Sequence, residues 1–231
     1  SVDHDSRYER AEEFVIACRT LWNTSGPVSF NGQYFSLNKA FCDVPVDDVG
    51  PRLYFGGVSQ KAIKLSGNQA DVHLLWIEPR QATEDRLRRF RKSFHDADRS
   101  PGFGLRSHVV VRNSENEAWD TAYGLVADAD PSVKSQRAFS VSGTPMEGQR
   151  SQVIEAEGHR ITERLWNGLS QVRVNCGTAI VGTPEQVTNI LLEYWKLGVD
   201  EFILSGCPHV EECQRVATDV LPLLKQKMAA T

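Results

Sequence analysis

The stretch Phe103-Gly-Leu-Arg-Ser-His-Val-Val-Val-Arg112 decides the fold of this chain. Successive side chains of a strand point to opposite faces. One face then carries Phe103, Leu105, Ser107, Val109 and Val111, and the other carries Arg106, His108 and Val110. The first face suits a layer of helices. A guanidinium and an imidazole on an inward face are costly unless they serve an anion or each other. We therefore predict a buried strand with two functional side chains, against the alternative of an edge strand with a wet face.

Short apolar strands alternate with helical segments on both sides of this stretch. The expected strands are 52–55, 71–76, 103–112, 179–181 and 201–204, and a β-hairpin is expected where 28–30 and 34–37 flank Asn31-Gly32. This alternation indicates βαβ units and a parallel sheet. We predict an α/β fold, a partial (β/α)8 TIM barrel with about five of its eight βα units plus the hairpin insertion. An open doubly wound sheet competes, but no strand is followed by G-x-G-x-x-G.

The helices follow from apolar spacing and from start signals. They are expected over 6–22, about 79–95, 114–126, 184–197 and about 210–225. Ser114 and Glu117 have the spacing of a capping box, and Thr183-Pro184 marks a helix start. Residues 128–150 show no clear period, and a further helix is expected from there to Trp166. We place the missing strands upstream of Ser1, so residues 1–231 are expected to form one domain that is incomplete at its N-terminus.

Composition and charge exclude several classes of protein. The formal net charge is −4, with 40% hydrophobic and 24% charged residues, which suits a globular protein and argues against nucleic-acid binding. No apolar run approaches the roughly 20 residues of a membrane helix. Five cysteines without paired spacing indicate a reducing compartment, so we expect a cytoplasmic protein. Cys207 and Cys213 flank His209 but lack the ligand number and spacing of a zinc site, so no metal site is predicted.

A glycine turn between a strand and a helix is a candidate phosphate site. Gly56 and Gly57 precede Ser59 at the start of a helix, where backbone N–H groups and the helix dipole favour a phosphate. The plainer interpretation is a tight turn. Tyr8 stands before the first helical stretch and has a phenol that can bind a phosphate, although an exposed tyrosine at a helix start is the simpler interpretation.

Three further residues stand where a pocket is expected. Arg173 follows a glycine-containing loop and can close over an anion as a bidentate donor, although a surface arginine has the same signature. Trp76 ends a strand and either walls a pocket or packs in the core. Cys207 follows the last strand, at the catalytic face of a barrel. Cys207 and His209 form a nucleophilic pair only by proximity, and a helix start is the simpler role for His209.

Four motifs occur in order along the chain. They are Pro51-Arg-Leu-Tyr-Phe-Gly-Gly-x-Ser, the stretch 103–112, Gly177-Thr-Ala-Ile-Val-Gly-Thr-Pro, and Phe202-Ile-Leu-Ser-Gly-x-Pro-His. From His4 to Leu221, this ordered set resembles the bacterial-luciferase-like flavin monooxygenases, and among them the alkanesulfonate monooxygenases. The resemblance implies a TIM barrel whose first three strands are absent here. It also implies reduced FMN from a separate NAD(P)H-dependent flavin reductase, and the O2-dependent cleavage of an organosulfonate to an aldehyde and sulfite.

The resemblance also implies roles for individual residues. Arg106 and His108 would lie at the sulfonate and the flavin, Arg173 would close over them, and residues 128–150 would belong to a lid. Tyr8, Gly57 and Ser59 would hold the FMN phosphate, and Gly56 and Trp76 complete the expected cofactor-binding set. Cys207 stands where the family has a tyrosine, and Val174-Asn175-Cys176 replaces a glycine-rich loop. We count Arg106, His108, Arg173 and Cys207 as the catalytic candidates.

Two alternatives stay open. The chain is a catalytically degenerate or fragmentary flavin-binding barrel, or it is a related luciferase-like oxidoreductase, such as a deazaflavin-dependent reductase, that acts on another substrate. For the full-length enzyme we expect a homo-oligomer.

Overall fold

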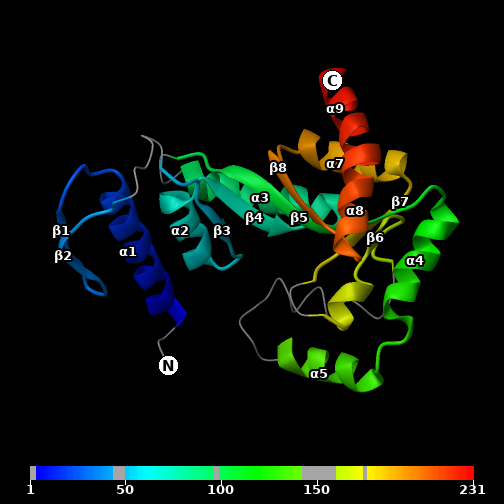
Figure 1. Ribbon diagram of the computed structural model, residues 1–231, viewed down its shortest axis with the longest axis horizontal. Coiled ribbons are helices and arrows are strands. Elements are labelled where there is room, and N and C mark those ends of the chain that lie inside the picture. The colour runs from blue at the N-terminus through cyan, green and yellow to red at the C-terminus, as the bar shows by residue number, and fades with distance from the viewer. Residues whose placement is uncertain (1–3, 44–49, 96–98, 142–159, 174–175) are drawn as a thin grey trace. The chain divides into compact units, whose positions relative to one another are not determined.

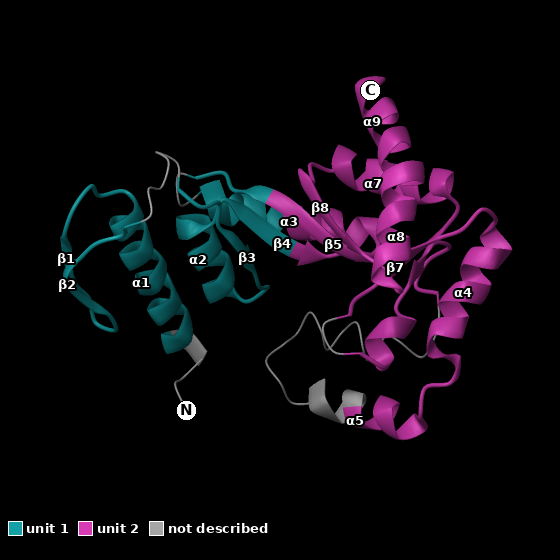
Figure 2. Ribbon diagram, in the orientation of Figure 1, with its two compact units in different colours: residues 1–74, 88–102 teal, residues 75–87, 103–231 magenta. Residues whose placement is uncertain are grey.

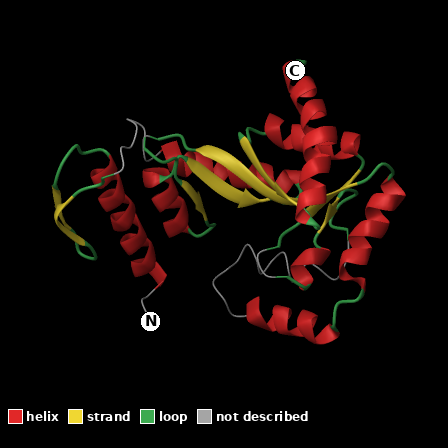
Figure 3. Cartoon of the chain, viewed as in Figure 1, coloured by secondary structure: helices red, strands yellow, loops and turns green. Residues whose placement is uncertain are grey.

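The computed structural model describes residues 4–43, 50–95, 99–141, 160–173 and 176–231 (Figure 1). In the first half of the chain the elements are α1 (His4–Trp22), β1 (Val28–Asn31), β2 (Ser36–Ala40), β3 (Tyr54–Gly56), α2 (Gln60–Gln69), β4 (Val72–Trp76), α3 (Arg80–His95) and β5 (Gly102–Val111). In the second half they are α4 (Glu115–Ala127), α5 (Pro131–Val141), β6 (Leu165–Trp166), β7 (Ala179–Gly182), α7 (Pro184–Lys196), β8 (Glu201–Ser205), α8 (His209–Arg215) and α9 (Leu221–Ala229). Strands and helices alternate along most of this sequence (Figure 3).

The chain divides into two compact units (Figure 2). Unit 1 consists of residues 1–74 and 88–102, and unit 2 of residues 75–87 and 103–231. Strand β4 contributes to both, because Leu74 is in unit 1 whereas Leu75 and Trp76 are in unit 2. No helix among the described residues has the length and apolar character needed to cross a membrane.

Unit 1 contains the hairpin, helix α1 and the first βα unit. Glu13 of α1 accepts the backbone N–H groups of residues 33, 34 and 35 at 2.9, 2.7 and 2.7 Å, which ties the hairpin turn to the helix. A Cβ on Gly32 would meet the carboxylate of Glu13, so a side chain at this position would have to displace the group that accepts the three N–H bonds. Strand β3 pairs in parallel with β4, with Tyr54 opposite Val72. The predicted hairpin and first βα unit are confirmed.

Unit 2 is organised around strand β5. Residues 108–111 of β5 pair in parallel with 179–182 of β7, and residues 104–108 pair in parallel with 201–205 of β8. Short strand β6 runs antiparallel to β7, with Trp166 opposite Ala179. In the described part of the chain, β3, β4, β5, β7 and β8 are each followed by a helix. The predicted α/β fold, a partial (β/α)8 barrel, is therefore confirmed.

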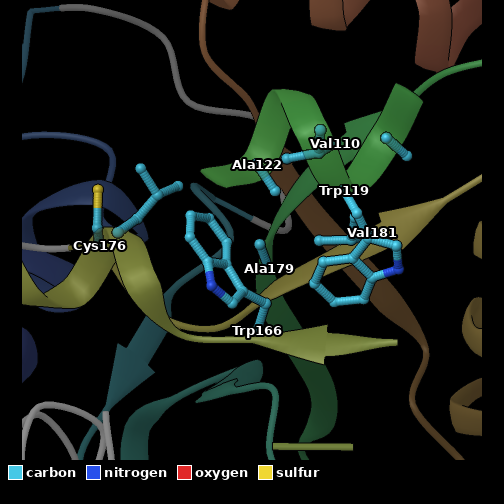
Figure 4. Packing of buried hydrophobic residues seen from close by; sticks show 9 residues of the cluster. Val110, Trp119, Ala122, Trp166, Cys176, Ala179 and Val181 are labelled. Carbon is cyan, nitrogen blue, oxygen red and sulfur yellow. The ribbon is translucent and has the colours of Figure 1, made fainter. Parts of the chain in front are cut away.

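A cluster of buried side chains forms a hydrophobic core in unit 2 (Figure 4). Trp119 and Ala122 of α4 and Trp166 of β6 are at most 3% exposed. They pack against Val110, Ala179 and Val181 of β5 and β7. Ser114 is the N-cap of helix α4, and its hydroxyl accepts the backbone N–H of Glu117, which is one of the two hydrogen bonds of the predicted capping box.

Three expectations from the sequence are wrong. Part of the supposedly irregular stretch 128–150 forms helix α5, which begins at Pro131, a residue that fits the first turn of a helix. The helix expected to end at Trp166 is absent there, because residues 165–166 form β6 on the edge of β7. The last helix is divided into α8, a π-helical turn at 216–220 and α9, and it extends to Ala229. Residues 142–159 lie outside the described residues.

Candidate functional site

Strand β5 presents both predicted functional side chains within unit 2. His108 is 3% exposed and Arg106 is partly buried, while their strand neighbours are buried on both faces. Ser107 helps to hold the strand, because its hydroxyl donates to the carbonyl oxygens of His108 at 2.8 Å and Thr178 at 3.2 Å. The prediction of a buried strand is confirmed, and the wet edge strand is excluded.

The Trp76 ring contacts both Arg106 and His108. It lies 4.4 Å from Arg106 Cζ, which is a cation–π contact. The same ring is nearly parallel to the His108 imidazole, with 6.4 Å between centroids and 8° between planes. The backbone supports this arrangement, since the N–H of Ile77, one residue after Trp76, donates to the Arg106 carbonyl at 2.9 Å. Trp76 is therefore a wall beside the cationic group as well as a packed side chain.

His108 lies in a positive environment. Burial lowers its pKa to about 4, and the positive charges of Arg106, Arg173 and His209 lower it further in that order. The imidazole is therefore neutral near pH 7. Its Nδ1 atom is buried and has no hydrogen-bond partner among the residues that the structure describes. A buried polar atom without a partner is costly, which points to a ligand at this position.

Cys176 contacts the other ring nitrogen. Its Sγ lies 3.4 Å from His108 Nε2, and Cys176 is 6% exposed. The backbone N–H of His108 donates to the Thr178 carbonyl at 3.1 Å, which holds the segment before β7 against β5. No local sequence pattern indicates this pair, because the two residues are 68 positions apart. Val174 and Asn175, which belong to the predicted departure from a glycine-rich loop, lie outside the described residues.

Arg173 and Cys207 are also brought together. Arg173 Nη1 donates to Cys207 Sγ at 3.5 Å, and the Arg173 side chain is exposed. His209 begins α8 and its Nδ1 lies 2.5 Å from the Gly206 carbonyl oxygen, so it donates to this carbonyl. The simpler role foreseen for His209, the start of a helix, is the one observed.

Glu212 of α8 is a second residue whose position the sequence did not reveal. It is 1% exposed, forms an ion pair with Arg112 and accepts the backbone N–H of Val111 at 3.1 Å. A Cβ on Gly206 would lie 2.4 Å from Glu212 Cβ and 3.1 Å from the Val109 carbonyl oxygen. The turn after β8 therefore fits closely against β5 because Gly206 has no side chain.

The phosphate candidates lie in unit 1. Gly57 has φ 155°, and a Cβ there would lie 2.6 Å from Ala62 Cβ, so the turn between β3 and α2 requires glycine. Ser59 is the N-cap of α2, and its hydroxyl accepts the Ala62 N–H at 3.2 Å. Tyr8 lies edge-on to Phe55, with 6.4 Å between ring centroids, which places it beside the strand that leads into this turn. A Cβ on Gly56 meets only ordinary contacts, so Gly56 is not required there.

The predicted residues thus form two groups. Unit 2 brings together Trp76, Arg106, His108, Arg173 and Cys207, to which Cys176 is added. Unit 1 contains Tyr8, Gly56, Gly57 and Ser59 around one turn. Among the described residues, no group of three or more histidine, cysteine or acidic side chains is placed to hold a metal ion.

Solved structures share this fold. They include a riboflavin lyase, RcaE, solved with modified FMN and riboflavin (TM-score 0.76, 18% identity), the EDTA monooxygenase EmoA from Chelativorans sp. BNC1 (0.72, 19%) and DmoA from Hyphomicrobium sulfonivorans (0.77, 16%). Each match covers 98% of this chain but only 59%, 62% and 57% of those chains, so the chain spans about three fifths of their length.

The sequence itself decides the family. The profile of the family described as luciferase-like monooxygenase matches residues 1–201, which is most of the chain. The chain therefore belongs to the luciferase-like monooxygenase family.

Proposed function

We propose that this protein is an FMN-dependent monooxygenase that cleaves an organic sulfonate to an aldehyde and sulfite. The observation that carries the proposal is the cationic cluster of unit 2. Arg106, Arg173 and His209 all lower the pKa of a buried imidazole, and that imidazole keeps one nitrogen without a partner among the described residues. Such a site suits an anion with several acceptor oxygens, and a sulfonate is one.

The residues present fit a flavin mononucleotide. In unit 1, the glycine turn at Gly57 leads into α2, a helix of 10 residues whose N-terminal N–H groups suit a phosphate. Ser59 and Tyr8 have hydroxyl groups that can join them. Among the structural relatives, the riboflavin lyase was solved with modified FMN and a type II Baeyer–Villiger monooxygenase with FMN.

Each side chain of the cluster has a distinct part in this proposal. When bound, reduced FMN supplies the electrons that activate O2. Arg106 and Arg173 bind the sulfonate oxygens as planar, permanently charged donors. Trp76 holds the Arg106 guanidinium and excludes water from one side. Neutral His108 exchanges a proton with the reacting oxygen atoms, because its pKa of about 4 leaves it uncharged at neutral pH.

The same cluster favours one class of substrate over another among those named for the structural relatives. One relative is named a long-chain alkane monooxygenase and another an EDTA monooxygenase. An uncharged alkane offers no acceptor oxygens to the guanidinium groups of Arg106 and Arg173, whereas an anionic substrate accepts hydrogen bonds from them. Cys207, in the position where the alkanesulfonate enzymes have a tyrosine, removes a phenol donor. The substrate is therefore expected to need fewer hydrogen bonds on this side.

Sulfite release tests the proposal. The purified protein is supplied with FMN, NAD(P)H, a flavin reductase and O2, and with linear alkanesulfonates of increasing length. We expect sulfite in proportion to aldehyde, and none without the reductase. The corresponding alkane and alkyl carboxylate series are the matched controls. If no sulfonate yields sulfite while FMN still binds, the substrate assignment is wrong and the flavin assignment stands.

A further inference from the structure

The buried pair formed by Cys176 and His108 has a role beyond the anion cluster. Its two atoms, Cys176 Sγ and His108 Nε2, lie 3.4 Å apart, within the range of a hydrogen bond to sulfur. Both residues are more than nine-tenths buried. The second ring nitrogen, Nδ1, is also buried and has no partner among the described residues. One nitrogen is thus held by a thiol, and the other is available to a ligand.

The chemistry of the two partners decides which atom carries the hydrogen. A thiol is a weak donor and its sulfur is a still poorer acceptor, whereas the bare nitrogen of a neutral imidazole accepts well. The favourable arrangement is therefore S–H donating to Nε2. A neutral imidazole has one N–H, and when Nε2 accepts, that hydrogen is on Nδ1.

We propose that Cys176 is a positioning residue, whose thiol donates to Nε2 of His108 and fixes the tautomer that carries its proton on Nδ1. The Nδ1–H is then a neutral donor beside the charged donors Arg106 and Arg173. Every polar group that faces the ligand would donate a hydrogen bond, which matches an anion that only accepts. This last step rests on the proposed function, whereas the tautomer does not.

The backbone places the thiol with the accuracy that this role requires. Thr178 accepts the N–H of His108 at 3.1 Å and the hydroxyl of Ser107 at 3.2 Å. Both bonds fix the chain two residues after Cys176 against β5. Cys176 also belongs to the buried cluster with Trp166 and Ala179, so its side chain has packed neighbours (Figure 4). The thiol thereby stays at His108 without a ligand.

The tautomer is measured directly by 15N NMR on protein with labelled histidine, without flavin or substrate. The chain has 6 histidines, and His108→Gln identifies the signals of His108. We expect a pyrrole-type shift for Nδ1 and a pyridine-type shift for Nε2. In Cys176→Ala both nitrogens should move to averaged values of two exchanging tautomers. Cys176→Ser retains a donor and should restore the original pattern, and Cys213→Ala, at an exposed cysteine, should leave it unchanged.

Two outcomes overturn the proposal: a proton on Nε2 in the unaltered protein, or an unchanged pattern in Cys176→Ala. A further measurement uses the unaltered protein, Cys176→Ser and Cys213→Ala, so that each variant identifies one S–H band by its loss. The infrared S–H band that disappears in the serine variant should lie at lower wavenumber than the band of exposed Cys213, since its hydrogen is donated. A band at the same position as Cys213 also contradicts the proposal.

Kinetics then test the role of the tautomer. Cys176→Ala should lower kcat about fivefold, the effect of one weak hydrogen bond, and Cys176→Ser should recover most of it. The KM for the sulfonate should change less than kcat, because the charged residues that bind it remain. If sulfite is never formed but the NMR pattern is as expected, the proposed function fails and the assignment of Cys176 stands.

Discussion

Two arginines on one face of the β5 segment, Arg106 and Arg112, have opposite environments. Arg106, in the first half of the strand, lies on the Trp76 ring beside a neutral imidazole. Arg112, just beyond the strand end, forms an ion pair with Glu212, and their side chains are 10% and 1% exposed. The same carboxylate accepts the N–H of Val111.

The two environments indicate that the charge of Arg112 is structural and that the charge of Arg106 is functional. At Arg112 the charge is neutralised inside the protein, and the pair fastens α8 to the end of β5. Around His108, by contrast, the side chains of Arg106, Arg173 and His209 all act to lower the pKa of the imidazole, and Arg106 lies on the Trp76 ring. A charge with a buried partner supports the fold, whereas several like charges around one buried titratable group indicate a candidate binding site.

The largest expected effect is on stability, at Glu212. Glu212→Ala leaves Arg112 buried without a counter-ion, which we expect to cost about 3–5 kcal/mol in the free energy of unfolding. Urea unfolding measures the loss, and Glu211→Ala, at the exposed neighbouring position, is the control. A loss below about 1 kcal/mol, the range of surface ion pairs, would contradict the structural role of the Arg112–Glu212 pair.

The second effect is on catalysis, at Arg106. Arg106→Ala should lower kcat/KM for a sulfonate about a hundredfold, because a preorganised charged donor is lost. Its free energy of unfolding should change by less than about 1 kcal/mol. Arg91→Ala, which removes the same charge from an exposed helix position, controls for net charge. An equally large loss of stability in Arg106→Ala would show that both arginines are structural.

The third effect concerns pH and His108. Its pKa is about 4 in the folded protein, below the 6.5 of an ordinary histidine. As the pH falls below 6.5, the unfolded chain binds this proton first, so the folded state loses stability down to about pH 4. We expect this group to cost about 2 kcal/mol at pH 5 relative to pH 8. His108→Gln should remove that part of the pH dependence, as followed by urea midpoints; an unaltered slope would contradict a buried neutral imidazole.

The smallest effect extends the comparison to unit 1. Ser59 and Ser114 are both N-caps whose hydroxyls accept a backbone N–H. Replacing either with alanine should cost about 1 kcal/mol of stability. Only Ser59→Ala should also weaken FMN binding in a fluorescence titration, with no change for riboflavin, which lacks the phosphate. Equal FMN affinity in both variants would leave Ser59 as a cap alone.

Local patterns predicted the parts of the fold that depend on nearby residues. The alternation in 103–112 was enough to predict a buried strand with Arg106 and His108 on one face, because strand geometry has a period of two. The cap at Ser114 followed from a spacing of three residues, and the helix start at Thr183 followed from Pro184 at the first helical position. These signals do not depend on the rest of the chain.

Distant pairing was not predictable in the same way. The sequence predicts a helix up to Trp166, but Trp166 pairs with Ala179 in an antiparallel strand pair. Cys176 meets His108 and Glu212 meets Arg112 because β7 and α8 are packed on β5, across 68 and 100 positions of sequence. Neither partner carries a local signal, since a buried cysteine and a helical glutamate are both common. The candidate site was therefore predicted by its arginines and histidine and not by the residues that orient them.

Gly206 limits how this family member can diversify. Any side chain there would displace Glu212, and with it the counter-ion of Arg112. Cys207, the next residue, has no such constraint and contacts only the exposed end of Arg173 among its described hydrogen bonds. We therefore expect substrate range to be adjustable at position 207, while a saturation library at position 206 should recover glycine alone. Two adjacent positions would then differ completely in the substitutions that they accept.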